Sequence, residues 1–258
     1  MILIPIKMKL LFLSLSMLLL TACDIGSNSI TEGIHVDFSA TPDTVSNLNA
    51  VAGPKTINVS GFGTVVLDKA YLVFSNLTIA DECDTQFVAM AEKALNFIIP
   101  AASAHTEATE NSTGEPVVIN LLLADGAEID LGNITLITDQ LCGVSIDMAV
   151  ADEDAVNLPA IGSGEPDMVG KSLYVSGTYN GNPFIISKSV TLIGRDLLFL
   201  TPLDLSATNL SEEVLIAVNY DSWFDSLDPA GLGDASPVQA DVDQFFINIA
   251  SSIHQKSN

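Results

Sequence analysis

Hydrophobic and polar residues alternate with a period of two in residues 35–38, 56–60 and 129–137, and this is the period of a β-strand that buries one face. Residues 64–79 are rich in β-branched and aromatic side chains and predict one long or bent strand. The β-rich runs on either side of Asn180-Gly181 predict a hairpin, because Asn-Gly suits a tight two-residue turn. Strands are predicted at residues 35–38, 56–60, 64–79, 117–123, 129–137, 141–150, 172–179, 184–193 and 214–219.

These strands define the expected fold class. About ten short strands without a strand–helix–strand rhythm favour a mainly β, antiparallel, immunoglobulin-like sandwich. No internal repeat divides the chain, and residues 35–258 are long enough for one large all-β domain.

Two segments carry helical spacing instead. Residues 84–97 place apolar side chains three and four apart after Asp84, which suits an N-cap, and predict a helix inserted in the sandwich. A second helix is predicted at the C-terminal end, with Ser236 as N-cap and Pro237 in its first turn. Its apolar stripe consists of Val242, Phe245, Phe246, Ile249 and Ile253.

The first residues have the layout of a secretory signal. Lys7 and Lys9 are their only charges, and an apolar run over residues 10–20 follows. That run is too short to span a hydrocarbon core, which needs about 20 residues. It ends in small residues, as signal-peptide cleavage requires.

The sequence Leu20-Thr21-Ala22-Cys23 resembles the bacterial lipobox, in which an aliphatic residue and two small residues precede a cysteine. The resemblance implies cleavage before Cys23 and diacylglycerol on its thiol. Residues 1–22 would then be a lipoprotein signal peptide, and residues 23–34 the lipidated cysteine with a small, polar, flexible tether. The alternative is a plain secretory signal with an incidental cysteine.

This resemblance also sets the expected location, which is the cell envelope of a bacterium. The chain would be anchored to the inner or outer membrane through its N-terminal lipid and would face the periplasm or the cell surface. Asp24 resembles the inner-membrane retention signal of enteric bacteria, a rule that transfers poorly to other lineages. The choice of membrane therefore stays open.

Charge narrows the range of partners. The chain has 32 Asp and Glu against 9 Lys and Arg, a net charge of −23, and loss of Lys7 and Lys9 with the signal makes it −25. Nucleic acid is disfavoured as a partner, because it rewards clustered Lys and Arg. Electrostatic adhesion to anionic lipid is disfavoured as well, which leaves the acyl chains to anchor the protein. A protein or small-ligand partner remains unspecified.

Two cysteines remain after lipidation of Cys23. Cys83 and Cys142 form an even pair in a chain expected outside the cytoplasmic membrane, so they predict a disulfide. Chain entropy gives such a bridge a stabilisation of about 4 kcal/mol. Two buried free thiols are the alternative, and metal ligation is disfavoured because neither cysteine belongs to a C-x-x-C motif.

Signals of catalysis are scarce. The chain lacks the serine-hydrolase elbow, the zinc-protease motif and the phosphate-binding loop. Ser103, His105 and Glu107 are close in sequence, but triad partners are seldom sequence neighbours. Residues 152–157 could offer oxygen ligands to calcium, although a solvated turn is the better interpretation. We therefore expect no enzyme activity, and we assign no catalytic and no metal-ligating residue.

Three segments resemble the methanobactin-associated periplasmic copper-binding proteins, namely residues 69–77, 214–224 and 246–250. Residues 104–116 instead resemble a group of uncharacterised bacterial lipoproteins. The copper-binding family implies an extracytoplasmic β-sandwich that holds copper through histidines and an oxidised tryptophan. Trp223 is followed by Phe224 and Asp225, with no histidine two residues on, so the copper ligands cannot be transferred to this chain.

Three hypotheses follow. The first is a membrane-anchored envelope lipoprotein with a non-catalytic β-sandwich binding domain and an unknown ligand. The second is a periplasmic metal-handling protein with copper as cofactor, for which His105 and His35 are the candidate ligands. The third is an envelope hydrolase, which would need a reactive serine or a carboxylate pair. Elemental analysis would identify the second, and an activity-based serine probe or a glycosidase panel the third.

Overall fold

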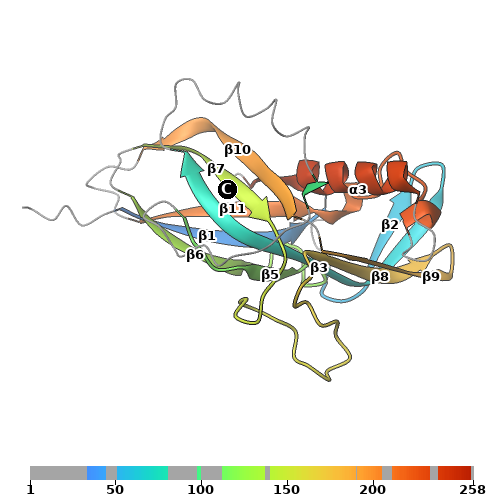
Figure 1. Ribbon diagram of the computed structural model, residues 1–258. Helices are drawn as coiled ribbons and strands as arrows, with labels where there is room; N and C mark the ends of the chain where they lie inside the picture. The colour runs from blue at the N-terminus through green and yellow to red at the C-terminus, as the bar shows by residue number, and fades with distance from the viewer. Residues whose placement is uncertain are drawn as a thin grey trace, which may run out of the picture. The chain divides into compact units, whose positions relative to one another are not determined.

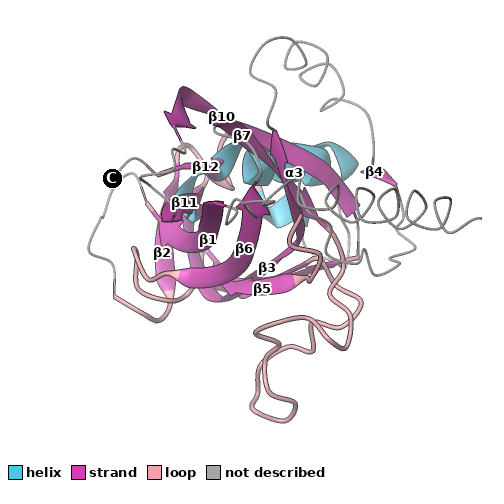
Figure 2. Cartoon of the chain, turned by 90° about the vertical axis from the view of Figure 1, so that its left-hand side faces the viewer, coloured by secondary structure: helices cyan, strands magenta, loops and turns pink. Residues whose placement is uncertain are grey.

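The computed structural model describes residues 34–44, 51–80, 98–99, 112–136, 140–189, 191–204, 211–232 and 238–256. Within this part of the chain, two β-sheets form a sandwich, so the mainly β prediction is confirmed (Figures 1 and 2). The smaller sheet has the order β12 (Ile253–Gln255), β11 (Ser211–Asn219), β1 (Ile34–Asp43), β6 (Ile129–Leu136). The larger has the order β4 (Ile98–Ile99), β10 (Thr191–Asp204), β7 (Gln140–Met148), β3 (Gly63–Ala80), β8 (Leu173–Tyr179), β9 (Asn182–Lys188). Two further strands, β2 (Lys55–Val59) and β5 (Val117–Asn120), pair with β3.

One hydrophobic core lies between the sheets and explains the alternation in the sequence. In β2, every second residue is buried, and the inward side chains Ile57 and Val59 join Phe38 of β1 and Phe74 of β3 in that core. Burying such a side chain stabilises the folded state by about 1.5–3 kcal/mol relative to leaving it exposed. The alternating pattern directs these side chains to one face of each strand, and their burial there stabilises the sandwich.

Strand β3 is the long strand that the sequence predicts, and it links both halves of the larger sheet. Its first half pairs with β2 and β8, while its second half pairs with β5 and β7. The register shifts between Leu67 and Lys69 and again between Phe74 and Asn76, so irregular pairing marks the places where partners change. Such irregularities bend a strand and increase its twist.

One pair of strands departs from the antiparallel pattern of the sandwich, and it involves β1. This strand lies between β6, with which it is antiparallel, and β11, with which it is parallel from His35–Ser211 to Asp43–Asn219. The direction of a pair between distant segments depends on how the chain returns to the sheet. The alternation of residues carries no information about it.

Strand prediction also fails around residue 190. The run 184–193 is divided between β9, which ends at Lys188, and β10, which begins at Thr191 and continues to Asp204. We did not predict the second part of β10. The charged residues Arg195 and Asp196 interrupt its apolar pattern, and its pairing with β7 shifts register between Leu192 and Arg195. By contrast, the Asn180-Gly181 hairpin is confirmed, with positive φ at both turn residues (49° and 82°).

The C-terminal helix is confirmed as α3 (Gln239–Ser252), although it begins later than predicted. Its N-cap is Val238 rather than Ser236, and Ser236 and Pro237 lie outside the described residues. Ile253, the last residue of the predicted stripe, belongs to β12. Residues 84–97, the predicted inserted helix, also lie outside the described residues.

Helix α3 packs on the core through aromatic side chains. The rings of Trp223 and Phe245 meet edge to face at 6.0 Å between centroids, and Phe224 lies 5.3 Å from Phe245. Phe224 also meets Phe184 of β9 edge to face at 6.4 Å. This cluster connects the helix with the larger sheet, and such pairs add about 0.5–1.5 kcal/mol each beyond area burial.

Candidate functional site

A cleft of about 770 Å³ lies beside β6 in the described structure. Its walls are β5, β6 and the connection between β7 and β8, residues 149–172, which extends away from the sandwich below β5 and β3 in Figure 1. We call it the acidic cleft. It is lined by Tyr71, Thr113, Glu115, Val117, Val118, Asn120, Leu123, Glu128, Ile129, Asp130, Leu131, Gly132, Asn133, Val156, Asn157, Pro159 and Glu165.

The long connection forms a fixed wall because it has a small core of its own. Ala151, Ala155 and Met168 are buried against the outer face of the larger sheet, on Tyr71, Val73 and Val118. Main-chain hydrogen bonds join the same layers, from Val118 N–H to the Val156 carbonyl (3.0 Å) and from Val156 N–H to the Pro116 carbonyl (2.8 Å). The cleft is thus built into the fold.

Tyr71 and Glu165 form the polar contact at the floor of the cleft. The Tyr71 hydroxyl donates to Glu165 Oε2 at 2.8 Å, and Lys69 Nζ lies 3.6 Å from the same oxygen. Burial, followed by the hydrogen bond to Glu165 and its charge, raises the pKa of Tyr71 above its ordinary value. Tyr71 therefore remains a neutral donor at physiological pH.

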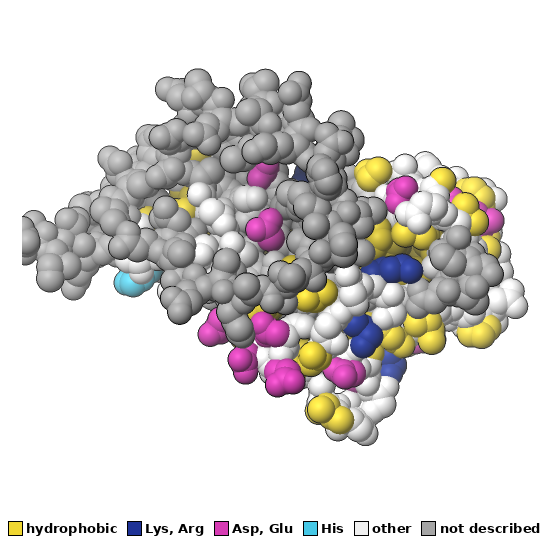
Figure 3. Space-filling model, in the orientation of Figure 1, with side chains coloured by type: hydrophobic (Ala, Val, Ile, Leu, Met, Phe, Trp, Pro, Cys, Tyr) yellow, Lys and Arg dark blue, Asp and Glu magenta, His cyan; other side chains and the backbone are white. Residues whose placement is uncertain are grey.

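Three carboxylates give the cleft its charge. Glu115, Glu128 and Asp130 are exposed, and no cation among the described residues pairs with them. Figure 3 shows acidic side chains gathered along this side of the described surface. An open site with unpaired carboxylates attracts cationic groups and repels anionic ones.

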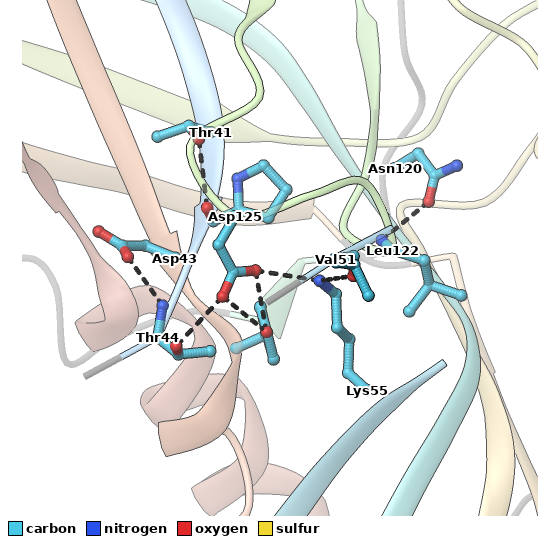
Figure 4. A network of polar contacts seen from close by, with 10 residues as sticks. Thr41, Asp43, Thr44, Val51, Lys55, Asn120, Leu122 and Asp125 are labelled. Carbon is cyan, nitrogen blue, oxygen red and sulfur yellow. Dashed lines mark hydrogen bonds and ion pairs between the residues drawn. The ribbon is translucent and has the colours of Figure 1, made fainter. Parts of the chain in front are cut away.

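A second polar cluster lies where β1 ends at Asp43, and it is built differently. Lys55 Nζ donates to Asp125 Oδ1 (3.1 Å) and to the Val51 carbonyl (2.9 Å), with both charged side chains almost fully buried, at 3% and 1% exposure (Figure 4). Thr44 Oγ1 donates to Asp125 Oδ2 at 3.1 Å, and the Tyr220 hydroxyl lies 3.0 and 3.2 Å from the two carboxylate oxygens. We call this set the Lys55–Asp125 network.

The network is saturated with partners. Lys55 Nζ also lies 5.6 Å from the centre of the Tyr220 ring, and none of these side chains has a buried polar atom without a hydrogen bond. Burial, followed by the Asp125 charge and hydrogen bond, raises the pKa of Tyr220 above its ordinary value. A fully satisfied buried network leaves no group free for a ligand, so its role is structural.

A smaller polar cavity of about 280 Å³ lies near the start of β12. It is lined by Asn219, Ser222, Asp225, Asn248, Ser251, Ser252 and His254. Ser222 Oγ and Ser252 Oγ donate to main-chain carbonyls, those of Asn219 and Ile249. His254 Nδ1 lies 3.1 Å from the Ser252 carbonyl oxygen. Neither serine thus donates to the imidazole as a catalytic nucleophile donates to its base.

Two polar side chains of this cavity, those of Asp225 and Asn219, are affected by burial. Burial, followed by the charge of Asp221, raises the pKa of Asp225 above its ordinary value. Asn219 Oδ1 is buried without a hydrogen-bond partner.

The predicted cysteines are only partly within view. Cys142 lies buried on β7, while Cys23 and Cys83 lie outside the described residues. Lipidation of Cys23 and a Cys83–Cys142 disulfide therefore stay predictions.

The histidines are distributed in the same way. His35 is exposed on β1 with Nδ1 3.1 Å from Thr135 Oγ1, whereas His105 lies outside the described residues, as do Ser103 and Glu107. The shared metal site of His35 and His105 is thus untested. Over the part of the chain that the structure describes, no three His, Cys, Asp or Glu side chains come together as a metal site would require.

Two further residues from the sequence analysis have clear places. Trp223 is fully buried, and its indole N–H donates to Ser252 Oγ at 3.0 Å, so it serves the core. Asp152 accepts a hydrogen bond from Asp154 N–H at 3.1 Å within the 149–172 connection.

Sequence reasoning missed both the acidic cleft and the Lys55–Asp125 network. One signal was present for the network, because Lys55 shares a strand face with Ile57 and Val59 and must point inward with them. An inward lysine requires a buried partner. The cleft has no comparable signal, since its carboxylates come from separate segments.

No described helix is both long and apolar enough to cross a membrane. In comparisons with known proteins, the chain matches no family model, no curated protein and no solved structure.

Proposed function

We propose that this protein is a membrane-anchored lipoprotein of the bacterial cell envelope whose β-sandwich is a non-catalytic binding domain. The single observation that carries the anchor is the sequence Leu20-Thr21-Ala22-Cys23 at the end of the apolar run. The small, polar residues after Cys23 lead to the first described strand, which begins at Ile34, so the lipid and the folded domain can be separate.

The acidic cleft is the proposed ligand site of that domain. It has a volume of about 770 Å³, its outer wall is fixed by a small core, and three of its carboxylates have no cationic partner among the described residues. Largely preformed clefts of about 300–1,000 Å³ with a few polar groups are the usual form of ligand sites. The ligand that this charge favours is cationic.

Replacement of the lipidation site tests the anchor. In bacteria that are fed an alkyne fatty acid, the wild-type chain should be labelled, and Cys23→Ser should lose both the label and normal cleavage. Cys142→Ser is the matched control, since it removes another cysteine and should keep the label. Equal labelling of wild type and Cys23→Ser would contradict the proposal.

The copper-handling alternative has a test of its own. It depends on His105, so elemental analysis of protein purified from the envelope decides it. One copper ion per chain in the wild-type protein, and loss of that copper in His105→Ala, would favour this alternative over a metal-free binding domain.

A further inference from the structure

Strand β6 borders the acidic cleft with an edge that has no strand partner among the described residues. It is the last strand of the smaller sheet, and within the described residues it pairs only with β1. An edge strand presents main-chain N–H and C=O groups that another extended chain can pair with. This edge can therefore bind a ligand that has a polypeptide backbone.

The lining of the cleft indicates that it follows this edge. A strand that presents one face to a cavity contributes every second residue, because successive side chains point to opposite faces. Six consecutive residues from Glu128 to Asn133 line the acidic cleft instead. Ile129 and Leu131 of this stretch are buried in the core, while Glu128, Asp130 and Asn133 are exposed. The cleft therefore runs along the backbone of β6 on its solvent side.

One donor of β6 already has a substitute acceptor. The Gly132 N–H donates to the carboxylate of Asp130 at 2.8 Å. The backbone of Gly132 has a φ of 97°, a conformation that favours glycine. A side-chain oxygen thus satisfies this N–H beside the register shift in the pairing of β6 with β1.

Charge restricts what can be added. Glu115, Glu128 and Asp130 surround the edge without a cation, so an acidic segment is repelled and a basic one attracted. Leu123, Val156 and Pro159, which are at least partly exposed, supply apolar surface in the same cleft. Alternating basic and apolar side chains on an extended segment would match both kinds of lining.

We propose that the edge of β6 binds an extended, basic segment of another protein as an added strand. Main-chain hydrogen bonds to β6 hold the segment, and its Lys or Arg side chains pair with the carboxylates of the acidic cleft. This inference rests on the proposed binding function and deepens it by naming the ligand class.

Backbone methylation provides the sharpest test. The full chain, purified in detergent, is titrated with a capped alternating Lys-Val octapeptide and with two isomers that carry N-methyl groups on either the lysines or the valines. In an extended strand, alternate N–H groups point to the same edge. One isomer should therefore lose at least about tenfold in affinity while the other binds as the parent does, and hydrogen exchange should slow in residues 128–136.

Protein variants test the charge. Glu115→Gln combined with Glu128→Gln should weaken parent-peptide binding about three- to tenfold. Glu213→Gln is the matched control, because Glu213 is an exposed carboxylate of the same sheet that lies on β11 and outside the cleft. Its affinity for the peptide should equal that of wild type.

Other outcomes overturn the inference in recognisable ways. Equal binding by both methylated isomers would mean that the cleft attracts cations without strand addition. Absence of parent-peptide binding would refute the inference while labelling of Cys23 still supports the anchor. A dimer in sedimentation that the peptide does not dissociate would assign the β6 edge to a second copy of the chain.

Discussion

Asp125 and Glu128 belong to one short segment between β5 and β6, yet their carboxylates meet opposite surroundings. The side chain of Asp125 is 1% exposed and is bonded to Lys55, Thr44 and Tyr220. Glu128 is exposed at the acidic cleft, with no cationic partner among the described residues. In a chain with few cations, the fold uses a buried lysine to secure one end of the sandwich and leaves the cleft acidic. The presence or absence of a cationic partner therefore distinguishes the structural carboxylate of Asp125 from that of Glu128, which we propose for ligand binding.

The largest effect is expected in the Lys55–Asp125 network. Asp125→Asn or Lys55→Met leaves a buried charge without its partner, which should lower the free energy of unfolding by about 3–5 kcal/mol. The double variant should recover part of this loss, because no lone charge remains. Urea unfolding of all four proteins measures both effects, and a loss below about 1 kcal/mol in either single variant would contradict the structural role.

Tyr220 should give a smaller effect with a particular pH dependence. Tyr220→Phe removes the hydroxyl contact with the Asp125 carboxylate and should cost about 1.5–3 kcal/mol at neutral pH. The pKa of Tyr220 is raised in the folded state, so above the ordinary tyrosine pKa of about 10 the folded chain keeps a proton that the unfolded chain releases. Stability from this group is thus full below about pH 10 and falls as pH rises further.

Between about pH 9 and 11, the free energy of unfolding measured in urea should fall more steeply with pH for wild type than for Tyr220→Phe. Tyr71→Phe is the companion variant, since burial, followed by the hydrogen bond to Glu165 and its charge, raises the pKa of Tyr71 as well. If the free energy of unfolding fell equally with pH in wild type and in both variants, the raised tyrosine pKa values would not contribute to stability as proposed.

The pair between Lys256 and Asp43 should be weaker. Its nitrogen and oxygen lie 3.1 Å apart, but the side chains are 30% and 12% exposed. Water and salt screen such a pair, so Lys256→Gln should cost about 0.5–1 kcal/mol, and 1 M NaCl should remove most of the difference. A penalty that salt leaves unchanged would show that packing, rather than charge, holds Lys256.

The smallest effect on stability is expected at the acidic cleft. Glu115→Gln and Glu128→Gln should leave the free energy of unfolding within about 0.5 kcal/mol of wild type, because these exposed carboxylates have no partner to lose. Thermal unfolding of the two single variants measures this. A loss above about 1 kcal/mol would place them with Asp125 as structural residues.

Sequence patterns predicted what depends on local order. Alternation identified β2 and β6, β-branched and aromatic content identified β3, the Asn180-Gly181 pair identified a hairpin, and the apolar stripe identified α3. Patterns failed where distant segments decide the outcome, as in the parallel pairing of β1 with β11 and in the bulged pairing of β10 with β7. The acidic cleft belongs to the second class, because Glu115, Glu128 and Glu165 meet only in the folded chain.

The position of β1 has a consequence for the order of folding. Its two partners are β6, from the middle of the chain, and β11, from near its C-terminal end. As the chain is synthesised or translocated from its N-terminus, β1 emerges first and stays incompletely paired until β11 is present. Contacts between such distant segments slow folding, because loop closure must precede their formation. The smaller sheet is thus completed late, and truncation before residue 211 would leave an open edge on β1 that is prone to aggregation.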